Sequence, residues 1–191
     1  MEKELNITDL LQSIRELRIS QRASYQEFRA SQEKTDKQIE KTDKQIEKTD
    51  KQVRALTKDI FGISTSMGLE AEEFFYNAVK EKMQLAGIKF DYASRNDKIA
   101  IKGEKQEIDI ILENGNYIGV IEVKNKVTKN TIKQMDKIIE KFYYFHPHFK
   151  NYKLIGAIAG KVFSEELIQL ALKKGYSVLT QKGEYMEQIN P

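Results

Sequence analysis

Three carboxylates and a lysine stand at alternating positions in a stretch that is otherwise mostly apolar. They are Glu107, Asp109, Glu122 and Lys124, and an Asn-Gly pair at 114–115 separates the two halves of the stretch. Asn-Gly is the strongest short signal for a β-hairpin. Because strand side chains alternate between the two faces, a loop of two or four residues puts all four groups on one face. Asp109 and Glu122 are then close enough to share a divalent cation.

A solvent-exposed hairpin can give the same pattern, with Glu and Lys on its open face. Two features favour a site instead. Residues 117–123 are apolar at nearly every position, which is typical of a strand covered on both faces. With a loop of two residues, Asp109 lies opposite Val120 and Glu107 lies opposite Glu122. The second pair joins like charges, and it is destabilising unless a positive group lies between them.

Asp109, a gap of 12 residues and Glu122-x-Lys124 resemble the motif of the PD-(D/E)xK nuclease superfamily, which includes type II restriction enzymes and archaeal Holliday junction resolvases. Ile108 stands where that motif has proline. The resemblance implies a restriction-endonuclease-like α/β fold, a mixed sheet flanked by helices. It also implies an endonuclease that needs Mg²⁺ or Mn²⁺ to hydrolyse phosphodiester bonds of DNA.

In this resemblance, Asp109, Glu122 and the backbone carbonyl of Val123 hold the cation. Lys124 orients the attacking water or helps to deprotonate it, and offsets phosphate charge. The role of Glu107 stays open, either as a ligand of a second metal or as a group that repels competing anions.

A fourth carboxylate, Glu72, comes from an amphipathic helix predicted over residues 66–86. It falls inside the apolar arc of that helix, between Val79 and Met83. A buried carboxylate is costly unless it is paired or binds a metal. The superfamily usually carries a Glu on its first core helix, so the resemblance implies that Glu72 supports the metal, directly or through water. The alternative is a Glu at the edge of a core face whose carboxylate reaches solvent.

The other predicted elements follow the order of the superfamily core, α-β-β-β-α-β-α-β, over about residues 66–182. Ser164 is the expected cap of the last helix and Gly175 its stop. In addition to the two strands of the hairpin, we expect strands at 88–93, 98–102, 152–159 and 176–180. We expect helices at 131–145 and 164–174.

The segment before the domain has a different pattern. The sequence Glu33-Lys-Thr-Asp-Lys-Gln-Ile39 recurs almost unchanged through Val53, with the seven-residue period of a coiled coil. With Ile39 at position a, one register runs from Leu11 to Ile60, over roughly 75 Å if the segment is helical throughout.

We therefore expect two parts, an N-terminal coiled-coil helix at 1–62 and a nuclease-like domain at 63–191, with a joint at Phe61–Ser66. Residues 11–60 are expected to join copies of the chain into a homo-oligomer, a dimer being favoured.

The seam of this coiled coil is weak. Threonine occupies three consecutive d positions, 35, 42 and 49, while Arg18, Gln21 and Gln32 are polar a or d residues. Such positions can help to set register. A single exposed helix or a partly disordered arm is the alternative, and the number and orientation of the strands stay open.

Composition narrows the function classes. The chain has 191 residues, no cysteine and a net charge of +3. It has no cysteine to form a disulfide or a thiolate zinc site. Because no long apolar stretch or signal peptide appears, we expect a soluble, cytoplasmic protein that does not insert into membranes. His146 and His148 are the two histidines, and two such ligands are weak evidence for zinc.

The distribution of lysines is more informative than the net charge. Lys126, Lys129, Lys133 and Lys137 follow the proposed site. A further lysine, Lys141, continues the spacing of four residues that begins at Lys129. On a helix they form one basic stripe that could bind the phosphate backbone of DNA, branched DNA included. An ordinary solvated helix face has the same appearance.

Two classes of function remain. The first is a metal-dependent nuclease oligomerised by its coiled coil. The alternative is a non-catalytic nucleic-acid-binding or coiled-coil scaffold module with a nuclease-like fold. Divalent metal binding separates the two, because a structural scaffold would show none.

Overall fold

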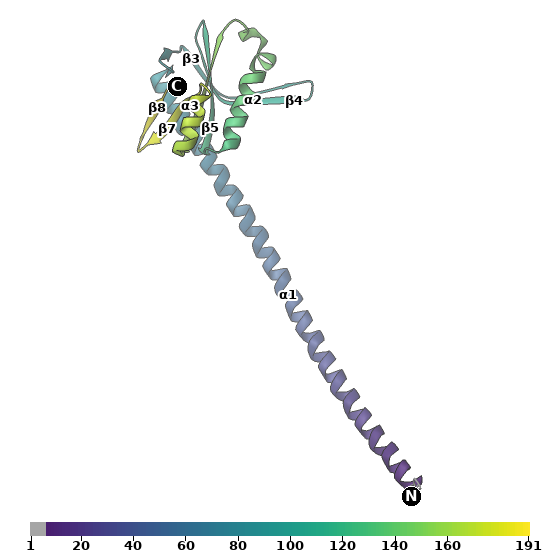
Figure 1. The fold of residues 1–191 in the computed structure, drawn as a ribbon. Coiled ribbons are helices and arrows are strands. Elements are labelled where there is room, and N and C mark those ends of the chain that lie inside the picture. Colours follow the sequence, from purple (N-terminus) through teal and green to yellow (C-terminus); the bar gives the residue numbers. More distant parts are fainter. Residues whose placement is uncertain (1–6) are drawn as a thin grey trace. The chain divides into compact units, whose positions relative to one another are not determined.

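The computed structural model describes residues 7–191, which form an α/β fold with a long N-terminal helix (Figure 1). The chain divides into two units, one that ends at Ile60 and one that begins at Phe61. The elements are α1 (Ile7–Lys82), β1 (Gln84–Leu85), β2 (Ile88–Lys89), β3 (Tyr92–Ile101), β4 (Glu104–Glu113), β5 (Tyr117–Lys126), α2 (Lys129–Phe145), the 3-10 helix η1 (Pro147–Phe149), β6 (Lys153–Val162), α3 (Glu165–Lys173), β7 (Ser177–Lys182) and β8 (Tyr185–Ile189).

Helix α1 supplies all of the regular structure in the described part of the first unit. Every residue from 7 to 60 is helical and exposed. The second unit begins at Phe61, the first residue of the predicted joint at Phe61–Ser66, and α1 runs through this segment without interruption to Lys82. Gly62 is the only strong helix breaker in that segment, and a single glycine costs about 1 kcal/mol relative to alanine, too little to end a long helix. The helix ends before Met83, whose φ is 45°.

The second unit contains a six-stranded mixed sheet in the order β3-β4-β5-β6-β7-β8. Strands β3, β4 and β5 pair antiparallel, β5, β6 and β7 pair parallel, and β8 pairs antiparallel to β7. Each parallel pair needs a crossover, which α2 and α3 provide. The predicted α/β class, a mixed sheet flanked by helices, is confirmed. Strand β8 was not predicted.

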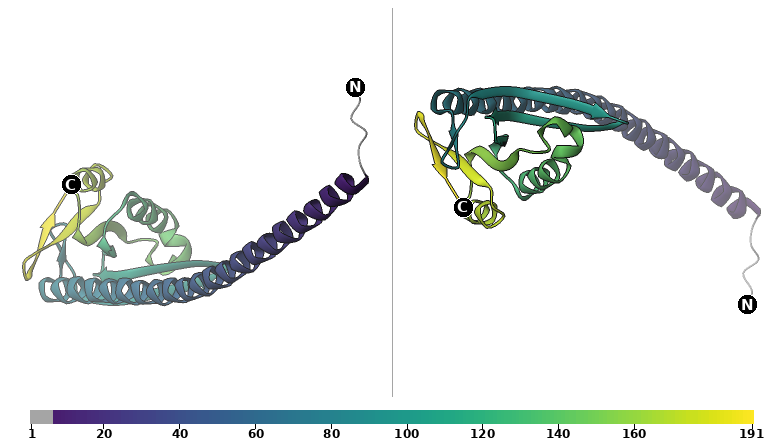
Figure 2. Two further views of the ribbon diagram at one scale, coloured as in Figure 1. Left: turned by 90° about the horizontal axis from the view of Figure 1, so that it is seen from below. Right: turned by 90° about the horizontal axis from the view of Figure 1, so that it is seen from above.

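Helices cover both faces of this sheet (Figure 2). The last turns of α1 pack Ala71, Phe75 and Val79 against one face. Helices α2 and α3 pack against the other face, through residues such as Met135 and Ala171. Strand β4 alternates between exposed and buried residues up to position 108 and is buried on both faces from 108 to 112. The sheet therefore becomes fully covered close to Asp109.

The β4–β5 hairpin has a loop of four residues rather than two. Glu113 pairs with Ile118, and the side-chain oxygen of Asn114 accepts hydrogen bonds from the backbone N–H groups of Asn116 (2.9 Å) and Tyr117 (2.8 Å). Those two bonds hold the wider turn. The opposed pairs expected for a two-residue loop, Asp109 with Val120 and Glu107 with Glu122, are therefore wrong. A four-residue loop keeps the same parity.

Several predicted bounds shift by a few residues. Strand β3 joins residues that were expected to lie in two short strands. Helix α2 begins at Lys129, where Thr128 and Thr131 form a reciprocal capping box. Ser164 stands at the N-cap of α3, as expected, but its side chain makes no capping hydrogen bond. Between residues 7 and 191, no helix is long and apolar enough to span a membrane.

Candidate active site

Asp109 and Glu122 come from adjacent antiparallel strands. Ile110 of β4 pairs with Ile121 of β5, so the two carboxylates stand directly beyond this pair. Both are buried, with 8% of Asp109 and 1% of Glu122 exposed. Strand β5 is apolar on both sides of Glu122, and the parallel strand β6 covers its other edge. The sequence therefore places one carboxylate in a strand that the fold covers completely.

Lys124 joins these carboxylates. Its Nζ forms an ion pair with Oε1 of Glu122, lies 3.7 Å from Oδ2 of Asp109 and donates a hydrogen bond to the carbonyl oxygen of Val123 at 2.9 Å. The backbone N–H of Val123 donates to Oδ2 of Asp109 at 2.7 Å. The structure thus brings together four of the predicted site residues, Asp109, Glu122, Val123 and Lys124.

Burial and mutual repulsion change the proton affinity of this cluster. Desolvation, reinforced by Asp109, raises the pKa of Glu122 from 4.5 to about 7. Desolvation also raises the pKa of Asp109, although Lys124 and the Val123 N–H oppose it. Burial disfavours the ammonium of Lys124, but the two carboxylates outweigh that effect and its pKa is raised. The cluster therefore holds more negative charge than its buried position readily accommodates.

Glu72 lies on the same side as Asp109, at the edge of the core rather than inside it. Its side chain is half-buried and lines a pocket of about 190 Å³ together with Asp109. Desolvation, followed by repulsion from Asp109, raises the pKa of Glu72. Glu72 therefore stands at the rim of the apolar face and lines the same pocket as Asp109.

The pocket includes two residues that the sequence did not single out, Arg95 and Asn96 of β3. The guanidinium of Arg95 lies over the ring of Tyr76, 5.1 Å from its centroid, and Asn96 has a φ of 57°. The pairing of β3 with β4 brings these residues to Asp109. Residues 94–97 carry no motif of their own, so the sequence did not indicate them.

Glu107 does not join the cluster of Asp109, Glu122 and Lys124. Its carboxylate is more than half exposed and forms an ion pair with Lys98 of β3 at 2.5 Å. In the observed register Glu107 does not face Glu122, and the sequence did not indicate Lys98 as its partner.

The donor set suits a hard divalent cation. Oε1 of Glu122 is buried, and its partner is the ammonium of Lys124. Two carboxylates and the carbonyl of Val123 are oxygen ligands of the kind that Mg²⁺ and Mn²⁺ prefer. Within residues 7–191, however, no three acidic or histidine side chains stand close enough to form a ligand group. Glu72 therefore suits contact through water better than direct ligation.

The predicted basic stripe is exposed, but part of its charge is neutralised. Lys129 forms an ion pair with Glu166 at 3.4 Å, and Lys141 forms one with Glu104. Lys126, Lys133 and Lys137 are exposed and make no ion pair with any described residue. These three lysines carry the free positive charge near the end of β5 and along α2.

His146 has a structural position. It is 2% exposed, its Nε2 lies 2.9 Å from Oδ2 of Asp97, and its ring stacks on Phe142. It thereby ties the end of α2 to β3. No histidine contributes to a ligand cluster in the described part of the chain.

The fold and the cluster define an α/β domain in which two buried carboxylates meet a half-buried lysine, where an antiparallel hairpin adjoins parallel strands. The chain belongs to the family described as "Domain of unknown function (DUF8196)", whose model matches residues 70–188. No curated protein matches the chain. A crystal structure of a repair endonuclease from Pyrococcus abyssi matches with a TM-score of 0.42 and 16% identity, over 58% of this chain and 46% of that one. The chain thus spans less than half the length of that protein.

Proposed function

We propose that this chain is a metal-dependent nuclease that hydrolyses phosphodiester bonds of DNA. The observation that carries the proposal is the meeting of two buried carboxylates, Asp109 and Glu122, with the ammonium of Lys124. These are the residues of the PD-(D/E)xK motif that the sequence resembles. A module that only binds nucleic acid gains nothing from buried carboxylates at a phosphate site, because they repel phosphate.

In the proposed mechanism, Asp109, Glu122 and the carbonyl of Val123 would hold Mg²⁺ or Mn²⁺, and Glu72 would support the ion through water. A bound cation supplies Lewis-acid polarisation of the phosphate and lowers the pKa of a water. Lys124 offsets the negative charge that accumulates on the phosphate. Its raised pKa keeps it protonated, which suits this electrostatic role better than removal of a proton from water.

DNA is the proposed substrate, and Lys126, Lys129, Lys133 and Lys137 are the proposed contacts to its backbone. We also propose that residues 11–60 pair copies of the chain. An assembly with two sites suits cleavage of two strands, or the bridging of two duplexes as in branched DNA.

The direct test is incubation of the full chain with labelled duplex, branched and single-stranded DNA in Mg²⁺, Mn²⁺ or EDTA. We expect cleavage that needs the metal. Asp109→Asn and Lys124→Ala should each lower the rate by about 100-fold or more. Asp109→Asn retains an oxygen for the Val123 N–H, so the circular dichroism spectrum should be unchanged.

Two matched variants serve as controls. Glu113→Gln removes a carboxylate at the far end of the same strand, and Lys173→Ala removes an exposed lysine on α3. Both should cleave at the parent rate. Metal-dependent cleavage that survives in both Asp109→Asn and Lys124→Ala contradicts the assignment. DNA binding without cleavage by the parent chain favours the non-catalytic module.

A further inference from the structure

Residues 7–60 of α1 expose an apolar stripe that polar residues interrupt at several a and d positions. Thirteen large hydrophobic side chains in this segment are at least 41% exposed, and ten of them occupy heptad positions a or d. The other three are Leu10, Leu17 and Ile19. The ion pairs Glu40–Lys44 and Glu47–Lys51 join b and f positions away from the stripe. An exposed apolar seam with charged outer positions is typical of a coiled-coil strand.

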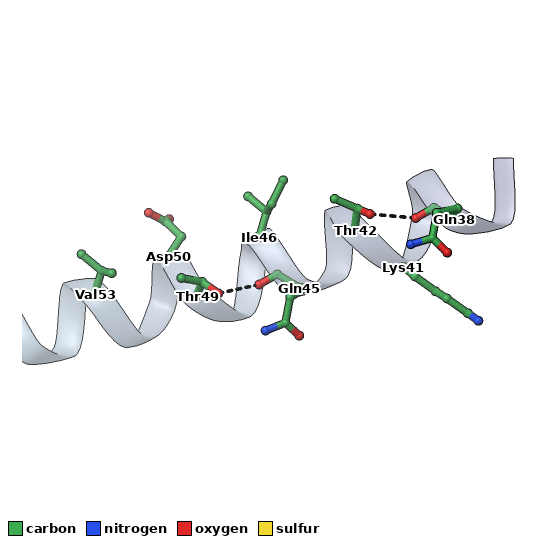
Figure 3. A pocket seen from close by; sticks show the side chains of 8 residues that line it. All are labelled: Gln38, Lys41, Thr42, Gln45, Ile46, Thr49, Asp50 and Val53. Atoms are coloured by element: carbon green, nitrogen blue, oxygen red, sulfur yellow. Dashed lines mark hydrogen bonds between the residues drawn. The ribbon is translucent and has the colours of Figure 1, made fainter. Parts of the chain in front are cut away.

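The three threonines at d are suited to burial. Thr35, Thr42 and Thr49 donate hydroxyl hydrogen bonds to the carbonyl oxygens four residues earlier, at 3.0, 2.9 and 2.9 Å. Figure 3 shows two of these bonds beside Ile46 and Val53, which line the same hollow along the helix. A hydroxyl that bonds within its own helix can be buried without losing a partner, so each threonine offers its methyl group to a neighbouring helix.

The charges that flank the seam divide by sign along the helix. Position e holds Arg15, Arg22 and Arg29 in the first half of the segment and aspartate at 36, 43 and 50 in the second half. Position g holds leucine, serine and glutamine from 10 to 52. In a parallel coiled coil, e residues face g residues of the partner, whereas in an antiparallel one they face e residues. Only the antiparallel arrangement sets these arginines against these aspartates.

We propose that residues 7–60 form a two-stranded antiparallel coiled coil with the same segment of a second copy, in the register in which facing a and d residues have numbers that sum to 67. This inference rests on the self-association proposed above, but not on the nuclease chemistry.

Four of the eight distinct core layers of this register pair two apolar residues, and Gln21, which faces Ile46, is the least well matched. Ile7 faces Ile60, Leu11 faces Leu56, Ile14 faces Val53 and Phe28 faces Ile39. The bulky Tyr25 faces the small Thr42, and Arg18 faces Thr49. In a parallel, in-register dimer, Arg18 instead faces Arg18 of the second copy, and the three threonines form three weak layers of their own. Like charges at a core position are costly.

The flanking pairs select the register. The sum of 67 applies to the a and d residues. In that register the e residues that face each other are Arg15 and Asp50, Arg22 and Asp43, and Arg29 and Asp36. Each pair occurs twice by symmetry. A shift of one heptad places Arg29 against Arg29 in one direction and Asp36 against Asp36 in the other. The chosen register also pairs the described segment fully, from Ile7 to the last residue of the first unit. The two Ile60 residues then lie about 80 Å apart, at 1.5 Å per residue.

Cysteine cross-linking tests the orientation cleanly, because the chain has no cysteine. Arg18→Cys and Thr49→Cys are made in separate full-length chains that carry tags of different size. Sedimentation first determines the mass of the assembly in three samples, each chain alone and a mixture of the two. Each sample is then oxidised with glutathione disulfide. We expect each sample to be dimeric. The mixture should give an efficiently cross-linked dimer that contains one chain with each tag, and either chain alone should hardly cross-link.

Efficient cross-linking of each variant with itself would reveal a parallel dimer and overturn the orientation, while leaving self-association intact. A monomer at micromolar concentration would overturn both. A trimer or tetramer would overturn the two-stranded arrangement. DNA cleavage plays no part in these readouts, so they are independent of the nuclease proposal.

A charge-reversal cycle tests the register. Arg22→Asp and Asp43→Arg should each weaken the dimer by about tenfold, because each creates two like-charge contacts. The double variant should regain the parent affinity. Lys37→Asp, at an outward f position, should change the affinity far less. Failure of the double variant to recover would overturn this register. Arg22–Asp43 is chosen because Asp50 already pairs with Arg54 of its own helix at 2.8 Å.

Discussion

At the scale of single residues, Glu122 has the strongest structural constraint in the site. It is almost completely buried, and it shares the ammonium of Lys124 with a second buried carboxylate. A group held in this way destabilises the fold when it is ionised. The same features suit it to a divalent cation, which can supply the charge that the protein leaves uncompensated.

Glu122 should make the stability of the metal-free chain depend on pH. Its pKa rises from 4.5 to about 7 on folding, so the native state binds more protons than the unfolded state between these values. The free energy of unfolding should therefore fall as pH rises from about 4.5 to about 7. Urea unfolding in EDTA at pH 4.5 and pH 8, followed by near-ultraviolet circular dichroism, measures this difference.

Glu122→Gln should reduce that pH dependence markedly. Asp109 and Glu72 also have raised pKa values, so a smaller decline of the same sign should remain. Glu113→Gln is the matched control and should keep the full dependence. A parent chain equally stable at both pH values would contradict the interpretation of Glu122.

At the scale of elements, the packing of α2 on the sheet depends on close approach at Gly156 of β6. A Cβ at this position would lie 2.7 Å from Cε of Met135 and 2.9 Å from Cδ1 of Tyr176. There is no room for it without displacement of the neighbouring side chains. Strand β6 can therefore serve as the central parallel strand only because this position has no side chain.

Gly156→Ala should lower the free energy of unfolding by about 1–3 kcal/mol, the usual cost of overpacking a filled core. Gly115→Ala, in the hairpin loop with no atom within 4 Å of the new Cβ, should change it by less than about 0.5 kcal/mol. Denaturant unfolding of both variants measures the difference. Equal stabilities would show that Met135 moves aside without cost.

At the scale of the whole molecule, metal binding is the property that separates the two classes of function. A ligand that binds only the folded state raises the melting temperature, by an amount equivalent to about 2.7 kcal/mol at a concentration 100 times its Kd. Calorimetry of the full chain with increasing Mg²⁺ should therefore show a rising melting temperature for the second unit.

Asp109→Asn and Glu122→Gln should abolish that rise, because they remove the proposed ligands. Glu113→Gln should retain it. A rise of equal size in all four proteins would place the bound metal elsewhere. The absence of a rise in the parent chain would favour the non-catalytic module.

Local patterns in the sequence determined much of this protein. The heptad repeat indicated a long helix, and the Asn-Gly pair indicated the hairpin that sets Asp109 beside Glu122. The parity argument held because it is the same for loops of two and four residues, although the side chain of Asn114 selected the longer loop. The division of position e into an arginine half and an aspartate half is also a property of the sequence alone.

Tertiary structure decided what no local pattern specifies. The order of the six strands, the addition of β8 and the arrival of Arg95, Asn96 and Lys98 near the site all depend on pairing between distant segments. The position of Glu72 at the rim of the core depends on how α1 packs against the sheet. Periodicity assigns a residue to a face of its own element. Burial, and with it the raised pKa of Glu122, depends on which other elements cover that face.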